Sequence, residues 1–85
     1  MIWQVRVARQ AQKEIKRIPA SDRERITIAL KEMSENPWSG DIARLKNERT
    51  AWRRRVGNYR IFFDVYVDQL MVEVVEVVRR TSTTY

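Results

Sequence analysis

Positive charge is concentrated in one short stretch of this chain. Residues 44–60 contain seven of its 17 lysines and arginines and only one acidic residue, so they carry a charge equal to the whole net charge of +6. The seven are Arg44, Lys46, Arg49, Arg53, Arg54, Arg55 and Arg60. A guanidinium group presents a planar fork of N–H donors that matches two oxygens of a phosphate. The stretch therefore indicates a site for a polyanion.

The residue types that the chain lacks exclude several kinds of chemistry. Its 85 residues include no cysteine and no histidine, which excludes disulfides, zinc sites of the Cys/His type, cysteine nucleophiles and triads that need an imidazole. The two glycines, Gly40 and Gly57, are too far apart to form a P-loop or a dinucleotide-binding turn. We therefore expect neither a metal nor an organic cofactor.

The arginines can be assigned to faces of a sheet from the turn between two strands. Gly57–Asn58 has the composition of a two-residue hairpin turn, since glycine readily adopts the positive φ that such turns need. The resulting pairing places Arg55 opposite Arg60 and Arg53 opposite Phe62, with the three arginines on one open face and no carboxylate close by. Like charges on facing strands repel, so a sequence selected only for folding would seldom oppose Arg55 and Arg60. The arrangement therefore favours a phosphate site. A solvated outer face, charged only for solubility, is the alternative.

The same alternation divides the aromatic residues between the two faces. Tyr59 and Phe63 fall on the face that we expect helices to cover, and Arg54 falls there too, reaching solvent at an edge. Phe62 and Tyr66 fall on the open face, where aromatic rings can stack on the bases of single-stranded RNA. A protein partner that covers these two rings is the alternative.

Apolar spacing predicts the elements that position these residues. β-Branched and aromatic residues alternate over Ile2–Val7 and predict a short strand. Apolar residues then recur at helical spacing until Pro19 ends the helix. Ser21 and Glu24 form a capping-box pattern, which predicts the start of a second helix that stops at Asn36–Pro37.

The second half of the chain reads as strands. Trp38–Ala51 shows no sustained period, and we expect a connection there. Three strands follow, at Trp52–Val56, Tyr59–Val67 and Leu70–Arg79. Asp68–Gln69 is a second candidate for a two-residue turn, which would bring Arg79 onto the open face. The order β-α-α-β-β-β predicts one α+β domain over residues 1–85, with a two-helix hairpin packed on one face of a small, mainly antiparallel sheet.

The sequence predicts neither a membrane span nor a secretion signal. The apolar runs are soon broken by charged residues such as Asp64. The first residues lack the charged start and the apolar run of a signal peptide. We therefore expect a cytoplasmic protein with no membrane partner.

The basic strand and the strands after it resemble those of a known toxin family. The pattern runs through Trp52–Val56, the tight turn and Asn58–Val65, then along a valine-rich strand into Arg79–Arg80 and a late tyrosine, Tyr85. It is similar to the RelE/ParE toxin superfamily, and in particular to its RelE-like branch, over essentially the whole chain. The resemblance implies the RelE-like fold and the toxin of a type II toxin–antitoxin system.

The resemblance also implies which residues form the active site. The family uses a set of basic residues and a carboxy-terminal tyrosine, whose positions fall on Arg53, Arg55, Arg60, Arg79 (or its neighbour in sequence) and Tyr85. Some RelE enzymes have lysines at the first two positions. Arginine stays protonated and cannot act as a general base, so Tyr85 is the candidate proton acceptor. We expect further contacts with RNA from Arg44, Lys46, Arg49, Arg80, Phe62 and Tyr66.

RelE-like members are ribosome-dependent ribonucleases, so the resemblance implies an enzyme that cleaves translated mRNA. The 2′-hydroxyl of the RNA would attack the adjacent phosphate without a metal, leaving a 2′,3′-cyclic phosphate and a 5′-hydroxyl. The expected partners are the ribosome, mRNA and an antitoxin whose inhibitory segment is acidic with interspersed apolar residues. Two alternatives stay open: a ParE-like inhibitor of DNA gyrase, and a non-catalytic RNA-binding module or decayed toxin.

Overall fold

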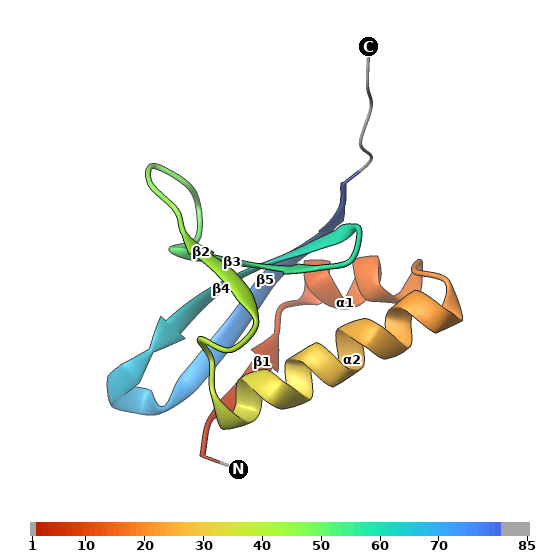
Figure 1. The fold of residues 1–85 in the computed structure, drawn as a ribbon. Helices are drawn as coiled ribbons and strands as arrows, with labels where there is room; N and C mark the ends of the chain where they lie inside the picture. Colours follow the sequence, from red (N-terminus) through yellow and green to blue (C-terminus); the bar gives the residue numbers. More distant parts are fainter. Residues whose placement is uncertain (1, 81–85) are drawn as a thin grey trace.

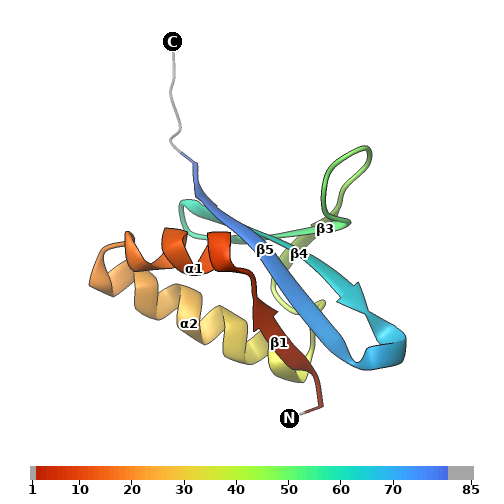
Figure 2. The same cartoon turned by 180° about the vertical axis from the view of Figure 1, so that it is seen from behind.

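Both helices lie on the same face of a five-stranded sheet, and no helix within residues 2–80 covers the other face (Figures 1 and 2). The computed structural model describes residues 2–80. Its elements in chain order are β1 (Gln4–Val7), α1 (Arg9–Lys16), α2 (Ala20–Glu35), β2 (Asp41–Arg44), β3 (Trp52–Val56), β4 (Tyr59–Tyr66), the 3-10 turn η1 (Val67–Gln69) and β5 (Met71–Arg79). This is the predicted α+β architecture with one more strand. Within residues 2–80, neither helix is long and apolar enough to cross a membrane.

The additional strand, β2, lies in the segment that we expected to be only a connection. The sheet order is β1-β5-β4-β3-β2, so β2 forms one edge. β1 pairs with β5 in parallel, and the other three neighbouring pairs are antiparallel. β2 has four residues, Asp41–Arg44, of which two are charged. Such a short edge strand forms because β3 offers it a partner, and its own composition gives little sign of it.

Helix α2 begins directly after a proline rather than at the predicted capping box. Pro19 precedes the helix with φ −54°, and no side chain caps the helix start. Proline has a preset φ and no N–H to satisfy, so a helix can begin directly after it. The Arg23 N–H donates to the Pro19 carbonyl oxygen over 2.8 Å. The predicted cap at Ser21 and Glu24 is therefore wrong, because both residues lie inside the helix.

The hydrophobic core lies between the two helices and the sheet. Ile26, Ala29 and Met33 follow helical spacing along α2 and are buried. They belong to the same buried cluster as Ile61 and Phe63 of β4, whose side chains have no exposed surface. The predicted inward face of β4 is confirmed at these positions.

The turn between β3 and β4 sets the register of the basic strand. Gly57 has a φ of +57°, the left-handed region that glycine adopts without strain. The pairs across this hairpin include Arg55 with Arg60 and Arg53 with Phe62, as predicted.

The turn between β4 and β5 is longer than predicted. β4 ends at Tyr66, which pairs with Met71, so the loop consists of residues 67–70 rather than two residues. The loop contains η1, followed by Leu70 in the left-handed region with φ +50°.

A β-bulge in β5 shifts the pairing of its second half by one residue. Phe63 pairs with Val74, whereas the preceding residue of β4, Phe62, pairs with Glu76. Val75 is the extra residue. Because side chains alternate between the faces of a sheet, a bulge exchanges the faces of all residues that follow it relative to an uninterrupted strand.

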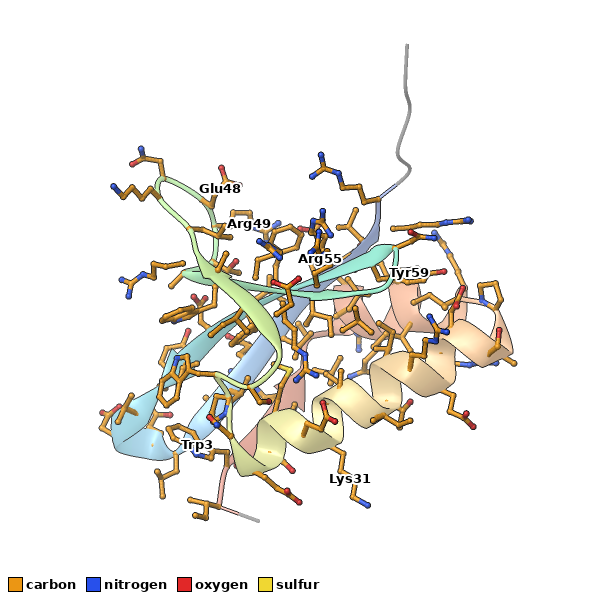
Figure 3. The ribbon with its side chains drawn as sticks, viewed as in Figure 1. Trp3, Lys31, Glu48, Arg49, Arg55 and Tyr59 are labelled. Atoms are coloured by element: carbon orange, nitrogen blue, oxygen red, sulfur yellow. The ribbon has the colours of Figure 1, made fainter. Side chains whose placement is uncertain are left out.

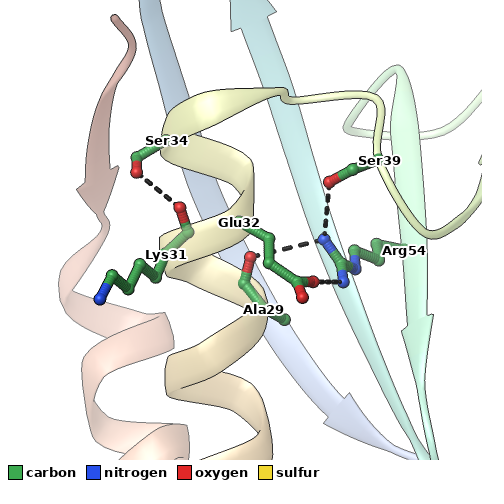
Figure 4. Close-up of polar contacts among 6 residues, drawn as sticks. All are labelled: Ala29, Lys31, Glu32, Ser34, Ser39 and Arg54. Carbon is green, nitrogen blue, oxygen red and sulfur yellow. Dashed lines mark hydrogen bonds and ion pairs between the residues drawn. The ribbon is translucent and has the colours of Figure 1, made fainter. Parts of the chain in front are cut away.

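Arg54 is the basic residue of β3 that points toward the helices, and it is only 7% exposed. Its guanidinium donates to the Ala29 carbonyl oxygen (3.4 Å) and the Ser39 hydroxyl (3.1 Å), and forms an ion pair with Glu32 (Figure 4). Gly40 leaves room for this group, since a Cβ there would lie 2.7 Å from the Arg54 Cζ. The expectation that Arg54 reaches solvent at an edge is therefore wrong.

We predict that Glu32→Gln lowers the free energy of unfolding by about 1–2 kcal/mol, measured by urea denaturation at pH 7. The change leaves the buried guanidinium without its counter-ion, and the cost is below that of a fully buried pair because Glu32 is itself about half exposed (53%). Glu35→Gln, at the end of the same helix, is the matched control and should change stability by less than about 0.5 kcal/mol. Equal effects of the two variants would contradict a structural role for the ion pair.

Candidate phosphate-binding site

Three neighbouring strands, β2, β3 and β4, place charged residues in a row across the open face of the sheet. The register sets Asp41 opposite Arg55, Arg55 opposite Arg60, and Arg60 opposite Val78. Directly opposed residues share a face. Figure 3 shows Arg55 on the side of the sheet away from the helices. The predicted juxtaposition of Arg55 and Arg60 is confirmed.

A second row lies one step further along the same strands. Arg53 pairs with Phe62, and Phe62 pairs with Glu76. This row also lies on the open face, because residues two apart in a strand point the same way. The structure therefore brings together Arg53, Arg55 and Arg60 with one aromatic ring, as the sequence predicted.

The chain just after β5 adds a fourth arginine. The Arg80 backbone N–H donates to the Asn58 carbonyl oxygen over 2.6 Å, which holds this residue beside the β3–β4 turn. We call Arg53, Arg55, Arg60 and Arg80 the arginine cluster.

The arginine cluster is electrostatically crowded around Arg60. Partial burial is the main cause that lowers the pKa of Arg60, and the positive charges of Arg80, Arg53 and Arg55 lower the pKa further. Asp41 acts in the opposite direction. A guanidinium in such surroundings is stabilised by an added anion, since the anion reduces the repulsion between the arginines.

One carboxylate lies within the arginine cluster, contrary to the expectation that none is close. The Arg55 Nη2 lies 2.7 Å from Oδ2 of Asp41, and the Arg55 Nε donates to the same oxygen over 2.8 Å. The Arg53 Nη1 is 3.9 Å from the other oxygen, Oδ1. Sequence reasoning missed Asp41 because it depends on the pairing of β2 with β3.

Arg79 lies on the helix-covered face, so the prediction that it joins the open face is wrong. The bulge at Val75 sets Arg79 opposite Tyr59, and Tyr59 is a core residue with 5% exposure. Burial, followed by the neighbouring Asp22, raises the pKa of the Tyr59 phenol. The Tyr59 hydroxyl donates to Oδ2 of Asp22 over 3.3 Å. The position beside the β3–β4 turn that the resemblance implied for Arg79 is held instead by Arg80.

The remaining predicted RNA contacts are dispersed. Arg44 pairs with Trp52 and stacks on its ring at 5.2 Å from the centroid, so it lies on the helix-covered face. Lys46 is exposed in the loop between β2 and β3. Tyr66 is on the open face but at the far end of β4. Tyr85 lies outside the described residues.

A shallow hollow adjoins the arginine cluster on the open face. It is lined by Glu48, Arg49, Thr50, Phe62, Val75 and Glu76. Figure 3 shows Glu48 and Arg49 in the loop that rises from this face. The hollow gives the predicted RNA-contacting residue Arg49 a place beside Phe62, and it adds two carboxylates that the sequence did not single out.

The open-face carboxylates differ in their partners. Asp64 accepts a hydrogen bond from the Ala51 N–H over 2.7 Å, and Glu73 accepts one from Arg6 over 2.9 Å. Glu76 has neither an ion pair nor a hydrogen bond with its side chain among residues 2–80. In the same part of the chain, no group of three acidic side chains is close enough to hold a metal ion.

The overall fold is similar to that of solved RelE toxins. A chain of the archaeal RelE–RelB complex from Pyrococcus horikoshii is 18% identical with a TM-score of 0.84, and the match covers 98% of this chain and 100% of that one. For the RelBE complex of Mycobacterium tuberculosis the identity is 19%, the TM-score 0.82 and the coverage 94% and 100%. The RelB–RelE complex of Methanococcus jannaschii contains a chain that is 27% identical with a TM-score of 0.72, and the match covers 87% of this chain and 88% of that one.

The sequence itself identifies the family. A search of curated proteins gave no match. The family model described as the ParE toxin of the type II toxin–antitoxin system, parDE, matches residues 5–83. With almost the whole chain matched and the RelE fold in place, this protein belongs to the ParE toxin family of type II toxin–antitoxin systems.

Proposed function

We propose that this toxin is a ribosome-dependent endoribonuclease that binds the phosphates of translated mRNA on its arginine cluster. The observation that carries the proposal is the position of Arg53, Arg55 and Arg60 on the uncovered face of the sheet, beside Phe62. Guanidinium forks bind phosphate oxygens, and an aromatic ring on an open sheet face can stack on a base. A sheet face charged only for solubility would gain nothing from opposing Arg55 and Arg60. The proposed place of action is the cytoplasm, where mRNA is translated.

The proposed reaction is an internal transfer of the RNA phosphate. The 2′-oxygen forms a bond to the adjacent phosphorus while its proton passes to an acceptor. The bond from phosphorus to the 5′-oxygen breaks, and that oxygen gains a proton. The products are a 2′,3′-cyclic phosphate and a 5′-hydroxyl. Arg60 and Arg80 would stabilise the negative charge that develops on the phosphorane oxygens, an effect that typically contributes 10²–10³-fold per group.

The reaction needs a group that accepts the proton of the 2′-hydroxyl. Arginine stays protonated, so it cannot take the proton. Tyr85 is the proposed acceptor, although a phenol with an ordinary pKa near 10 is a weak base at neutral pH. Substrate positioning by the ribosome would compensate for this weakness. We therefore propose little cleavage of free RNA.

The second candidate function is inhibition of DNA gyrase. It is favoured by the family model that matches the chain, since that model represents a ParE toxin. Such an inhibitor needs a protein-binding surface and no proton acceptor. The arginine cluster favours the ribonuclease, because binding to gyrase does not require several guanidinium groups gathered on one face of the sheet.

We also propose that an antitoxin covers the arginine cluster between episodes of activity. The similar structures from Pyrococcus horikoshii and Methanococcus jannaschii are complexes of a RelE chain with a RelB chain. The complementary segment for this chain is acidic with interspersed apolar residues, since Phe62 adjoins the positive charge and Tyr66 lies further along the same open face.

We predict that expression of the chain alone in bacteria stops growth and cleaves mRNA within translated regions. The new upstream ends should carry 2′,3′-cyclic phosphates and the downstream ends 5′-hydroxyls, which end-specific ligation followed by sequencing can detect. Filamentation with DNA damage and intact mRNA would support gyrase inhibition instead. Normal growth with intact mRNA and DNA would indicate a decayed toxin.

We predict that Arg60→Met abolishes growth arrest without lowering stability. The methionine keeps an apolar stem but removes the charge opposite Arg55, so the free energy of unfolding should stay equal or rise by up to about 1 kcal/mol, more at low salt. Arg60→Lys is the matched control that keeps the charge and should retain part of the toxicity. A loss of stability above about 1 kcal/mol in Arg60→Met would show that Arg60 is structural.

We predict that Tyr85→Phe slows cleavage on programmed ribosomes by about 10²-fold or more, since only the hydroxyl is lost. Glu76→Gln is measured beside it, because Glu76 is the open-face carboxylate that lines the hollow next to Phe62. Unchanged cleavage by Tyr85→Phe, with a large loss in Glu76→Gln, would transfer the role of proton acceptor to Glu76.

A further inference from the structure

The carboxylate of Asp41 occupies the arginine cluster in the way that a phosphate would. One of its oxygens, Oδ2, meets both Nε and Nη2 of Arg55 at 2.8 and 2.7 Å. The other, Oδ1, faces the Nη1 of Arg53 at 3.9 Å. One carboxylate thus lies between two guanidinium groups, with close contacts to Arg55 and a longer one to Arg53, so it takes a position that a bound phosphate could take.

This carboxylate relieves a repulsion that the fold imposes. The β3–β4 register places Arg55 directly opposite Arg60, and like charges in this arrangement destabilise a sheet. Asp41 completes the same row from the other side, since β2 pairs it with Arg55. The row therefore runs from the negative Asp41 to the positive Arg55 and Arg60. The negative charge of Asp41 partly offsets the repulsion between the two arginines.

The ion pair is exposed enough to exchange with another anion. The side chains of Arg55 and Asp41 are 53% and 49% exposed. Ion pairs at this exposure are weak, because water solvates the separated charges well. Asp41 also lies at the start of an edge strand, where only one neighbouring strand constrains it. By contrast, the buried Arg54 ion pair has no such freedom.

We propose that Asp41 is an internal substitute for phosphate: it binds Arg55 and Arg53 in the free toxin and is displaced when an RNA phosphate binds. The proposal rests on the proposed RNA-binding function of the arginine cluster. It makes Asp41 a residue that weakens RNA binding while stabilising the free protein. Asp41 thus keeps Arg55 ordered without leaving the cluster open to every polyanion in the cell.

The stabilising half of the proposal can be tested without RNA. At low salt, Asp41→Asn should lower the melting temperature by about 2–5 °C. In the Arg60→Met background the same change should cost less than half as much, because the repulsion that Asp41 offsets is gone. Asp68→Asn, the same chemical change in η1 at the other end of β4, is the matched control and should have no measurable effect. Equal losses in both backgrounds would overturn this half.

The exchange is tested by binding to a 12-nucleotide single-stranded RNA with 2′-O-methyl groups, which the toxin cannot cleave. Asp41→Asn should bind about three- to tenfold more tightly than the wild-type chain at 50 mM salt. The slope of the logarithm of its binding constant against the logarithm of the salt concentration should become steeper by about 0.7, which corresponds to one further phosphate contact. Asp68→Asn should match the wild-type chain in both quantities.

The outcomes separate this inference from the function on which it rests. If Arg53→Ala and Arg60→Met lose RNA binding while Asp41→Asn equals the wild-type chain, the arginine cluster binds RNA and the exchange is wrong. Weaker binding by Asp41→Asn would also overturn it, since Asp41 would then position Arg55 for the ligand. If Asp41→Asn and Asp68→Asn tighten RNA binding equally, the effect comes from the change in net charge alone, and the exchange is overturned. If the wild-type chain binds no RNA, both the proposed function and the exchange are overturned.

Discussion

The register of the β3–β4 hairpin is the constraint on which the site depends. Three consecutive arginines occupy β3, and alternation forces the middle one to the face opposite that of its neighbours. A slip of one residue would bury Arg53 and Arg55 and expose Arg54. Gly57 fixes the turn through its positive φ, and the contacts of Arg54 with Glu32, made only in the observed register, hold it in place. The ion pair of the buried Arg54 therefore positions the arginines of the open face.

The bulge at Val75 has a comparable effect on the carboxyl-terminal strand. Without it, Arg79 would share the open face with Arg60. With it, Arg79 faces Tyr59 and Arg80 follows on the side of the arginine cluster. β-Bulges often redirect side chains next to functional sites. The shift is compatible with a buried β5, because Val74 before the bulge and Val77 after it both pack into the core.

The sequence predicted those features that depend on local pattern. The helices follow apolar spacing, and the Gly57–Asn58 turn determined the pairs that gather Arg53, Arg55 and Arg60. The errors concern features that depend on distant partners. β2 forms because β3 is available, so Asp41 could not be placed from its neighbours in sequence.

Two further errors have the same origin. The burial of Arg54 depends on Glu32, which is 22 residues away in sequence. The bulge in β5 leaves the run of valines around it unbroken, so no turn signal or change of composition marks it. Valines before and after the bulge fit either register, and only the pairing with β4 decides between them.

The central claim is that the arginine cluster binds RNA phosphate, and the side-chain Nε–H resonances of the arginines test it most directly. In an NMR titration with a non-cleavable RNA, the account predicts shifts at Arg53, Arg55 and Arg60, with Arg54 unchanged because it is buried against α2. Shifts confined to the arginines of α1 and α2, with those three unchanged, would contradict the account.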